Sequence, residues 1–216
     1  KKEFNYSAIN NFAVREARGE YLLFLNNDVE IITESWLEEM LQLCQQKDVG
    51  MAGAKLYYPD DTIQHAGVVV GLGGVAAHVL CKLPRDAEGY MGRLRCVQEI
   101  SAVTAACMMV KTSVFKAVGG FDEELKVAFN DIDLCMKVRK YGVKIVFTPY
   151  AELYHYESKS RGMEDTPEKQ LRFSREVNCF RRKWERELLK GDPYYNPNLT
   201  LNNTDCSLRK QEKNGD

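Results

Sequence analysis

The sequence predicts an α/β fold whose mixed, mostly parallel sheet is flanked by helices. The first observation behind this prediction is periodicity. Short apolar runs typical of strands alternate with stretches whose apolar residues recur every three or four positions. The second is composition, because 44% apolar and 28% charged residues are ordinary values for a globular protein. The third is length, since 216 residues suffice for one large domain or at most two small ones.

The first half of the chain contains the clearest strand and the clearest helix start. Tyr21–Leu25 is continuously apolar, so we expect a strand buried on both faces. Ser35 and Glu38 fit a capping box at the start of a helix. The elements expected around them are a helix over residues 8–18, a helix over 35–46, and strands over 49–56 and 68–72.

The second half resumes the alternation after residues 71–95, a glycine-containing stretch that is typical of a long functional or mobile loop. Strand pieces are expected over residues 100–103, 108–110, 144–148 and 152–155, and helices over 113–118, 132–141 and 166–190. Pro149 is expected to break the last two strand pieces apart. Residues 1–190 are thus predicted to form the folded domain and residues 191–216 an extended polar tail.

Charge and cysteine content exclude several classes of protein. Thirty basic against 31 acidic residues give a net charge of -1, so binding of nucleic acid by bulk charge is not expected. Seven cysteines, an odd number without any C-x-x-C pair, fit neither a disulfide framework nor a zinc site. Reduced thiols favour a cytoplasmic protein.

Asp28 directly follows the apolar strand Tyr21–Leu25, in the sequence Asn26-Asn27-Asp28. In open α/β sheets ligands bind at the carboxyl ends of strands, so Asp28 is a candidate metal ligand. A turn, or a cap on the next helix, explains the same pattern equally well.

A second acidic pattern, Asn130-Asp131-Ile132-Asp133, opens the helix expected over residues 132–141. Carboxylates are favoured at a helix N-terminus, so one of the two aspartates is expected to be a cap. The functional interpretation is that the other faces a cleft as a general base.

His155 ends the last expected strand and leads into Ser158-Lys159-Ser160-Arg161-Gly162. Hydroxyls, cations and a glycine in this loop could hold a diphosphate, although a solvated surface loop has the same composition. His65 and His78 are interpreted as structural residues.

Six short motifs in order resemble the family 2 glycosyltransferases. They are Leu25-Asn-Asn-Asp28, Trp36-Leu37, Gly53-Ala-Lys-Leu-Tyr-Tyr-Pro59, Gly119-Gly-Phe-Asp122, Asn130-Asp-Ile-Asp-Leu-Cys135 and Tyr154-His-Tyr-Glu-Ser158. The resemblance covers about residues 4–190. It implies an inverting enzyme of GT-A fold that moves a sugar from a nucleotide-sugar to a saccharide or lipid-linked acceptor in surface polysaccharide synthesis.

The resemblance also implies residue roles. Asp28 and His155 would hold Mg²⁺ or Mn²⁺ against the donor diphosphate, with Asn27, Ser158 and Arg161 also on the donor side. Asp131 would be the base, and Gly120, Phe121, Asp122 and Asn130 would shape the acceptor side. Two departures stand out: the family's D-x-D motif has lost its first acid at Asn26, and its Glu-Asp base motif reads Asn130-Asp131.

The family's N-terminal nucleoside-binding segment has no counterpart here. We therefore expect an N-terminally truncated metal- and acceptor-side portion that is inactive alone and self-associates through its exposed truncated side. The family implies a cytoplasmic protein that is compatible with peripheral association at the inner membrane face. The alternatives are a non-catalytic, degenerate interaction module and a nucleotidyltransferase that makes the donor.

Overall fold

The computed structural model describes residues 4–157 and 166–210. Within that part the central sheet has the order β1-β8-β3-β9-β2, with β4 added on β3 and β7 on β9, and β5 and β6 form a separate pair. The strands are β1 (Tyr21–Leu25), β2 (Val29–Ile31), β3 (Val49–Tyr57), β4 (Ile63–His65), β5 (Val68–Val70), β6 (Ala76–His78), β7 (Gln98–Glu99), β8 (Cys107–Lys111) and β9 (Lys144–His155).

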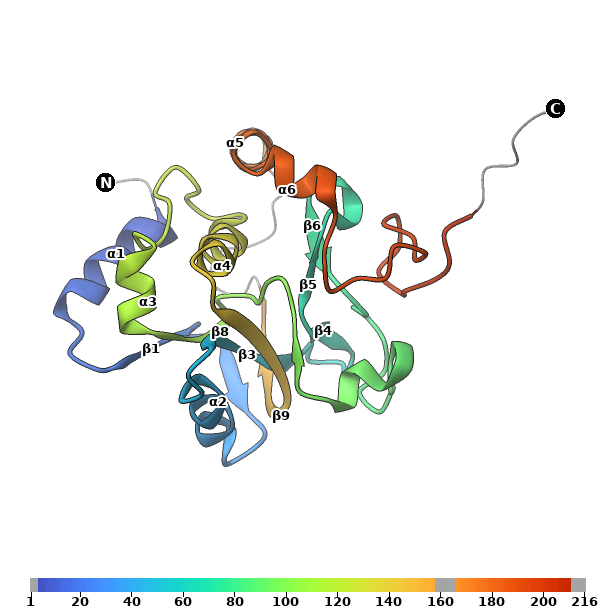
Figure 1. Ribbon diagram of the computed structural model, residues 1–216, viewed down its shortest axis with the longest axis horizontal. Coiled ribbons are helices and arrows are strands. Elements are labelled where there is room, and N and C mark those ends of the chain that lie inside the picture. The colour runs from blue at the N-terminus through green and yellow to red at the C-terminus, as the bar shows by residue number, and fades with distance from the viewer. Residues whose placement is uncertain (1–3, 158–165, 211–216) are drawn as a thin grey trace.

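Helices surround this sheet (Figure 1). They are α1 (Tyr6–Glu16), α2 (Trp36–Cys44), α3 (Thr112–Ala117), α4 (Asn130–Lys140), α5 (Pro167–Lys183) and α6 (Glu185–Lys190), with 3₁₀ turns η1 (Leu72–Gly74) and η2 (Tyr90–Arg95). In the described part of the chain, none of these helices is both long and apolar enough to cross a bilayer.

The sheet is mixed and mostly antiparallel, so the prediction of a mostly parallel sheet is wrong. Among the described strands, β3 and β9 form the parallel pair, and the other pairings of the central sheet are antiparallel. Periodicity indicates that strands alternate with helices, but it does not fix which strands become neighbours. Antiparallel neighbours need no crossover unit.

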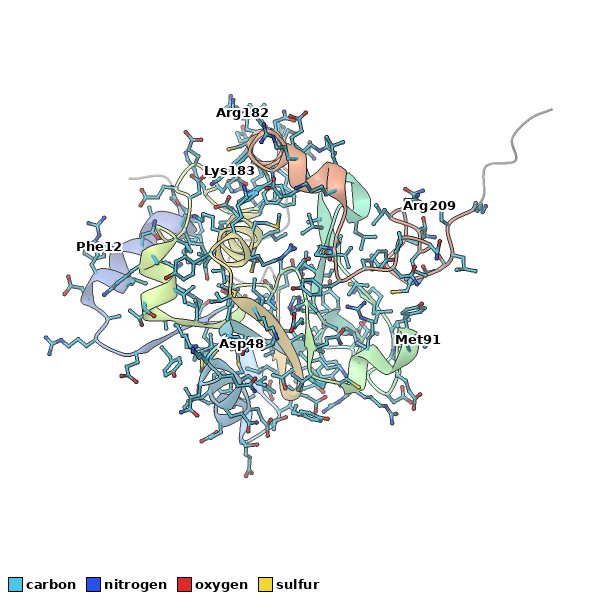
Figure 2. The ribbon with its side chains drawn as sticks, in the orientation of Figure 1. Phe12, Asp48, Met91, Arg182, Lys183 and Arg209 are labelled. Atoms are coloured by element: carbon cyan, nitrogen blue, oxygen red, sulfur yellow. The ribbon has the colours of Figure 1, made fainter. Side chains whose placement is uncertain are left out.

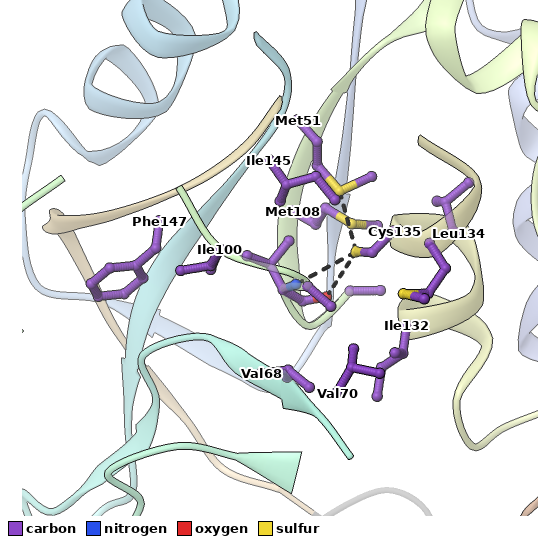
Figure 3. Packing of buried hydrophobic residues seen from close by; sticks show 14 of the residues in the cluster. Met51, Val68, Val70, Ile100, Met108, Ile132, Leu134, Cys135, Ile145 and Phe147 are labelled. Atoms are coloured by element: carbon purple, nitrogen blue, oxygen red, sulfur yellow. Dashed lines mark hydrogen bonds between the residues drawn. The ribbon is translucent and has the colours of Figure 1, made fainter. Parts of the chain in front are cut away.

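Two apolar layers hold the sheet between helices. On one face, α2 packs its buried Trp36, Met40 and Cys44 against β3, β8 and β9. On the other face, α3 and α4 cover the sheet, and Cys135 of α4 sits among Met51 and Met108 in a sulfur-rich part of the core (Figure 3). The Cys135 thiol lies 3.6 Å from the Val103 carbonyl oxygen, so α4 is fixed directly over the sheet.

Strand β1 is buried on one face rather than on both, contrary to the sequence expectation. Leu22 and Phe24 are buried, whereas Leu23 and Leu25 are 36% and 40% exposed. The reason is the position of β1 at the end of the sheet order, beyond the strands that α2 covers. Phe12 on the neighbouring α1 also points outward (Figure 2).

Three local expectations, about a helix cap, a helix and a strand, are corrected. Ser35 is the N-cap residue of α2, but its side chain makes no capping hydrogen bond. The helix expected over residues 166–190 is two helices, α5 and α6, separated at Trp184, and its expected apolar side is incomplete because Leu171 and Phe173 are exposed. Residues 100–103 form no strand, and β7 precedes them.

Strand β9 runs through Pro149 without ending. Its pairing with β3 shifts there, because Gly53 pairs with Phe147 whereas Lys55 pairs with Glu152. Proline has no N–H to donate to a neighbouring strand, and a bulge removes that requirement. β9 can therefore extend to His155, which is what brings this histidine to the far end of the sheet.

The tail lies against the β5–β6 pair and its flanking turns. The Gly73 amide donates to the Leu201 carbonyl at 2.8 Å, and the Leu80 amide donates to the Thr204 carbonyl at 2.6 Å. The Asp192 carboxylate accepts from the Val70 amide at 2.8 Å. Residues 191–210 therefore wrap around the surface of the β5–β6 pair. Within residues 71–95, η1, β6 and η2 stand where the sequence is typical of a long loop.

Candidate functional site

A pocket of about 440 Å³ collects the candidate residues from distant parts of the sequence. Asp28 enters from the end of β1, His155 from the end of β9, and Asp131 from the first turn of α4. The remaining walls are the start of α1 and the turn before β8; the lining includes Phe4, Tyr6, Ile9, Leu25, Asn26, Asn27, Thr104, Ala105, Asn130 and Glu157. The structure thus brings together three residues that the sequence analysis singled out separately.

Asp28 and His155 face each other inside this pocket. The His155 Nε2 atom lies 3.3 Å from the Asp28 Oδ1 atom, and both side chains are largely buried. β2 creates this approach: it pairs antiparallel with β9, Val29 lies opposite His155, and the Tyr156 amide donates to the Asp28 carbonyl at 2.8 Å. Short strand β2 therefore fixes Asp28 beside the end of β9.

The electrostatics at this pair are unbalanced. Burial lowers the pKa of His155, and the charge of Asp28 offsets this only in part. The imidazole is therefore neutral at pH 7, since its pKa lies below the ordinary value. The Asp28 Oδ1 atom is buried and accepts no hydrogen bond from the described residues. Within residues 4–157 and 166–210, this buried oxygen therefore has a neutral imidazole beside it and no ion pair with a Lys or Arg side chain.

A divalent cation fits these two residues. Adjacent ligands around a small divalent ion lie about 3 Å apart, since each is about 2.1 Å from the metal. The described residues contain no group of three or more His, Cys, Asp and Glu side chains that could hold a metal. The protein would therefore supply a carboxylate and an imidazole, and water and phosphate oxygens would complete the shell.

Asp131 and Asp133 have different surroundings although they are only two positions apart. Asp131 lines the pocket; its Oδ2 atom accepts from the Ala105 amide at 3.2 Å and its Oδ1 atom from the Ile132 amide at 2.8 Å. Asp133 is fully buried and accepts from the Trp184 Nε1 group at 2.8 Å. Asp131 is therefore the aspartate of this pair that faces the pocket, while it also satisfies an amide of the first turn of α4.

The predicted neighbours divide between pocket and core. Asn27 and Asn130 line the pocket. Phe121 is buried against Phe24 and Phe115, Gly120 has a φ of +66° in the turn after α3, and Asp122 pairs with Lys183 at 2.5 Å. These three residues do not line the pocket. Of the four residues predicted for the acceptor side, Asn130 is the one that does. Ser158 and Arg161 lie outside the described residues.

Sequence reasoning missed several residues that build the site. Gln64 lies behind His155, the Thr104–Ala106 turn holds Asp131, and Tyr6 covers the same wall. Burial, and secondarily the charge of Asp131, raises the pKa of Tyr6 far above its ordinary value. No sequence pattern marks the Thr104–Ala106 turn. Gln64 is a polar residue in the buried strand β4, so a predicted strand at residues 63–65 would have drawn attention to it.

Glu176 of α5 was also missed. Its carboxylate is buried and accepts from the Val127 and Ala128 amides at 3.0 and 2.9 Å. The next residue, Phe129, has a left-handed backbone with a φ of +60° and leads directly into α4. The signal was available: Glu176 lies four residues before Phe180, so on a helix the two share one side, where a buried acid requires a partner.

Comparisons with known proteins place this chain in a family. Residues 1–176 match the model of a family described as "Glycosyltransferase like family". The chain is 57% identical over 208 residues to the uncharacterized protein y4gI of Sinorhizobium fredii, a match that covers 96% of this chain and 23% of that protein. It is 42% identical over 214 residues to the O-antigen biosynthesis protein RfbC of Myxococcus xanthus, a match that covers 99% of this chain and 16% of that protein.

A solved structure supports the same fold. The mannosyltransferase PcManGT from Pyrobaculum calidifontis, in complex with GDP-Man and Mn²⁺, superimposes with a TM-score of 0.56 at 15% identity, over 86% of this chain and 45% of that one. At this identity the likeness shows a GT-A-like fold. The chain spans less than a quarter of the length of the two sequence relatives.

Proposed function

This chain belongs to the glycosyltransferase-like family, and on that premise we propose that its pocket is the metal and acceptor side of an inverting glycosyltransferase site. The observation that carries the proposal is the buried Asp28 Oδ1 atom, which lies 3.3 Å from a neutral imidazole and accepts no hydrogen bond from the described residues. Such an oxygen is stabilised when a cation binds beside it.

Asp28 and His155 would hold Mg²⁺ or Mn²⁺. When bound, the ion supplies positive charge against the diphosphate of a nucleotide-sugar. Asn27 lines the same wall and is placed to contact the donor. Ser158 and Arg161 keep their proposed role in holding the diphosphate.

Asp131 would act as the general base. Each of its oxygens accepts one backbone hydrogen bond, and a carboxylate oxygen has a second lone pair free to take a proton. The acceptor hydroxyl would give its proton to Asp131 and attack the anomeric carbon from the face opposite the leaving nucleotide, which inverts that centre. Asn130, 3% exposed and bonded to the Val127 carbonyl, fixes the turn that carries the base.

The biological setting of this proposal is surface polysaccharide synthesis, because RfbC carries the description of an O-antigen biosynthesis protein. The proposed donor is a nucleotide-sugar and the proposed acceptor a saccharide or a lipid-linked saccharide. This chain spans a small share of its relatives, so the activity belongs to the longer protein, and we expect the 216 residues alone to show little transfer.

Metal binding tests the proposal in this chain directly. We would titrate Mn²⁺, followed by UDP, dTDP or GDP, into the wild type and into Asp28→Ala and His155→Ala, with detection by electron paramagnetic resonance. Asp48→Asn is the matched control, because Asp48 pairs with Lys144 at the start of β9, the opposite end of that strand from His155. Binding by the wild type and the control, and its loss in both pocket variants, is expected; equal binding by all four proteins contradicts the metal site.

Transfer itself is tested in a chain of the relatives' full length that carries this segment. Asp131→Asn is expected to keep Mn²⁺ binding and to lower transfer by at least about a hundredfold, since general bases contribute about 10²- to 10⁴-fold. Metal binding without any transfer from a panel of nucleotide-sugars would instead favour the degenerate interaction module.

A further inference from the structure

Gln64 occupies an unusual position for an amide side chain. It lies on β4, is 4% exposed, and is directed at the end of β9. Its Oε1 atom lies 2.7 Å from the His155 Nδ1 atom. Its Nε2 group lies 3.3 Å from the His155 carbonyl oxygen and 3.4 Å from the Glu157 carboxylate. Both ends of the amide are therefore used at one place, around His155.

These contacts determine which way the amide points. The nitrogen end faces two oxygens, and oxygens of a carbonyl and a carboxylate can only accept. A flipped amide would set its oxygen against both of them and would direct its NH₂ group at the imidazole. The chemistry thus selects the orientation in which Oε1 faces His155.

An amide oxygen that can only accept requires a proton on the ring nitrogen that it contacts. A histidine of ordinary pKa is neutral at pH 8, and in a neutral ring a proton on Nδ1 leaves Nε2 with a lone pair. On the opposite side of the ring, the Asn26 Nδ2 atom lies 3.1 Å from Nε2, which fits a lone pair on that nitrogen. The Gln64 contacts therefore select the tautomer, and the Asn26 contact is consistent with it.

We propose that Gln64 is a positioning residue that fixes this tautomer of His155. The ring nitrogen 3.3 Å from the Asp28 Oδ1 atom then carries a lone pair, which a bound cation would take over from the Asn26 amide. This role of Gln64 rests on the proposed function, because Nε2 can bind a metal only when it carries no proton. With the other tautomer, Nε2–H would point at the Asp28 oxygen, and the two residues would satisfy each other without a cation.

The tautomer can be measured without any metal. The chain has three histidines, so two-bond ¹H–¹⁵N correlation spectra at pH 8 resolve each ring, and the signals lost in His155→Gln identify His155. In the metal-free wild type we expect a protonated Nδ1 and an unprotonated Nε2. A protonated Nε2 in the folded wild type overturns the proposal without the need for a Gln64 variant.

Variants of Gln64 then separate positioning from packing. Gln64→Met keeps the length and removes the acceptor, and we expect it to mix the tautomers and to weaken Mn²⁺ binding about ten- to hundredfold. Ile63→Val, in the same buried strand, is the packing control and should change neither. A folded Gln64→Met variant with an unmixed wild-type tautomer would refute the role of Gln64.

Mn²⁺ binding tests the proposed metal site and not the tautomer. A wild type that shows the expected tautomer but binds no Mn²⁺ removes the proposed metal function and leaves the tautomer assignment supported.

Discussion

Two carboxylates, Asp28 in the pocket and Asp133 under α5 and α6, are both buried but differ in what faces them. Asp133 lies 3.1 Å from the Lys137 ammonium and 2.7 Å from that of Lys183, and it accepts from the Trp184 indole. Among the described residues, Asp28 faces a neutral imidazole. The described part of the chain thus compensates Asp133 with two cations, whereas the proposed role of Asp28 assigns its charge to a bound metal ion.

The difference between the two carboxylates is tested by removing each charge in turn. Asp133→Ala removes the acid that Lys137 contacts and leaves Lys183 with Asp122 alone, and we expect a loss of about 3–5 kcal/mol in the free energy of unfolding. Asp28→Ala removes a poorly compensated charge and should cost less than about 1 kcal/mol without metal. Urea denaturation measures both; a similar loss for the two would show that Asp28 is also structural.

Metal should narrow that difference in stability between the two variants. Mn²⁺ at about a hundred times its dissociation constant is expected to stabilise the wild type by about 2.7 kcal/mol, because a ligand that binds only the folded state adds RT ln(1 + [L]/Kd). Asp28→Ala should lose this gain and Asp48→Asn should keep it. Thermal melts with and without Mn²⁺ provide the measurement, and a gain retained in Asp28→Ala would place the ion elsewhere.

Glu176 extends the comparison to an acid whose partners are backbone amides. The Glu176→Gln variant would keep one acceptor for Val127 or Ala128, and we expect a loss of about 2 kcal/mol, typical for hydrogen bonds to a charged group. Glu168→Gln in the first turn of α5, where the side chain is exposed, is the control and should stay within about 0.5 kcal/mol. Equal stabilities in urea would show that α5 does not hold the turn before α4.

The smallest expected effect concerns pH. Burial, then the neighbouring His78 and His155, lowers the pKa of His65 well below its ordinary value. In the unfolded chain His65 takes up a proton near pH ~6.5, whereas in the folded chain it stays neutral at that pH. His65 therefore contributes to the free energy of unfolding above this pH, and its contribution falls as the pH drops below it. The slope is at most about 1.4 kcal/mol per pH unit. Comparing the pH dependence of unfolding in the wild type and His65→Gln checks this; parallel curves would contradict it.

The sequence predicts the residues proposed to bind or react better than it predicts the residues that hold them in place. Asp28, Asp131 and His155 follow from motif order and from their places at element ends, and the structure places all three in one pocket. Gln64 could not be found in this way, because its role depends on β4 pairing with β3 and so lying beside the end of β9. Contacts across strands are set by pairing, which periodicity along one strand does not contain.

The same limit explains the fold. The helices and most strands follow from local apolar spacing, but the antiparallel β1–β8 pairing depends on residues far apart in sequence. Exposure of Leu23 and Leu25 follows from that pairing, since it places β1 at the end of the sheet order. Self-association through this side stays a prediction.

The parallel pairing of β3 with β9 also orders events during synthesis. Asn26 and His155 are 129 positions apart, and β2, next to Asp28, has its partner strand only in β9. A ribosome adds about 5–20 residues per second, so the first half of the chain waits several seconds or more with β2 unpaired. During that interval the nascent chain exposes strand edges that only its own C-terminal half can cover. Chaperone demand should therefore peak just before β9 emerges.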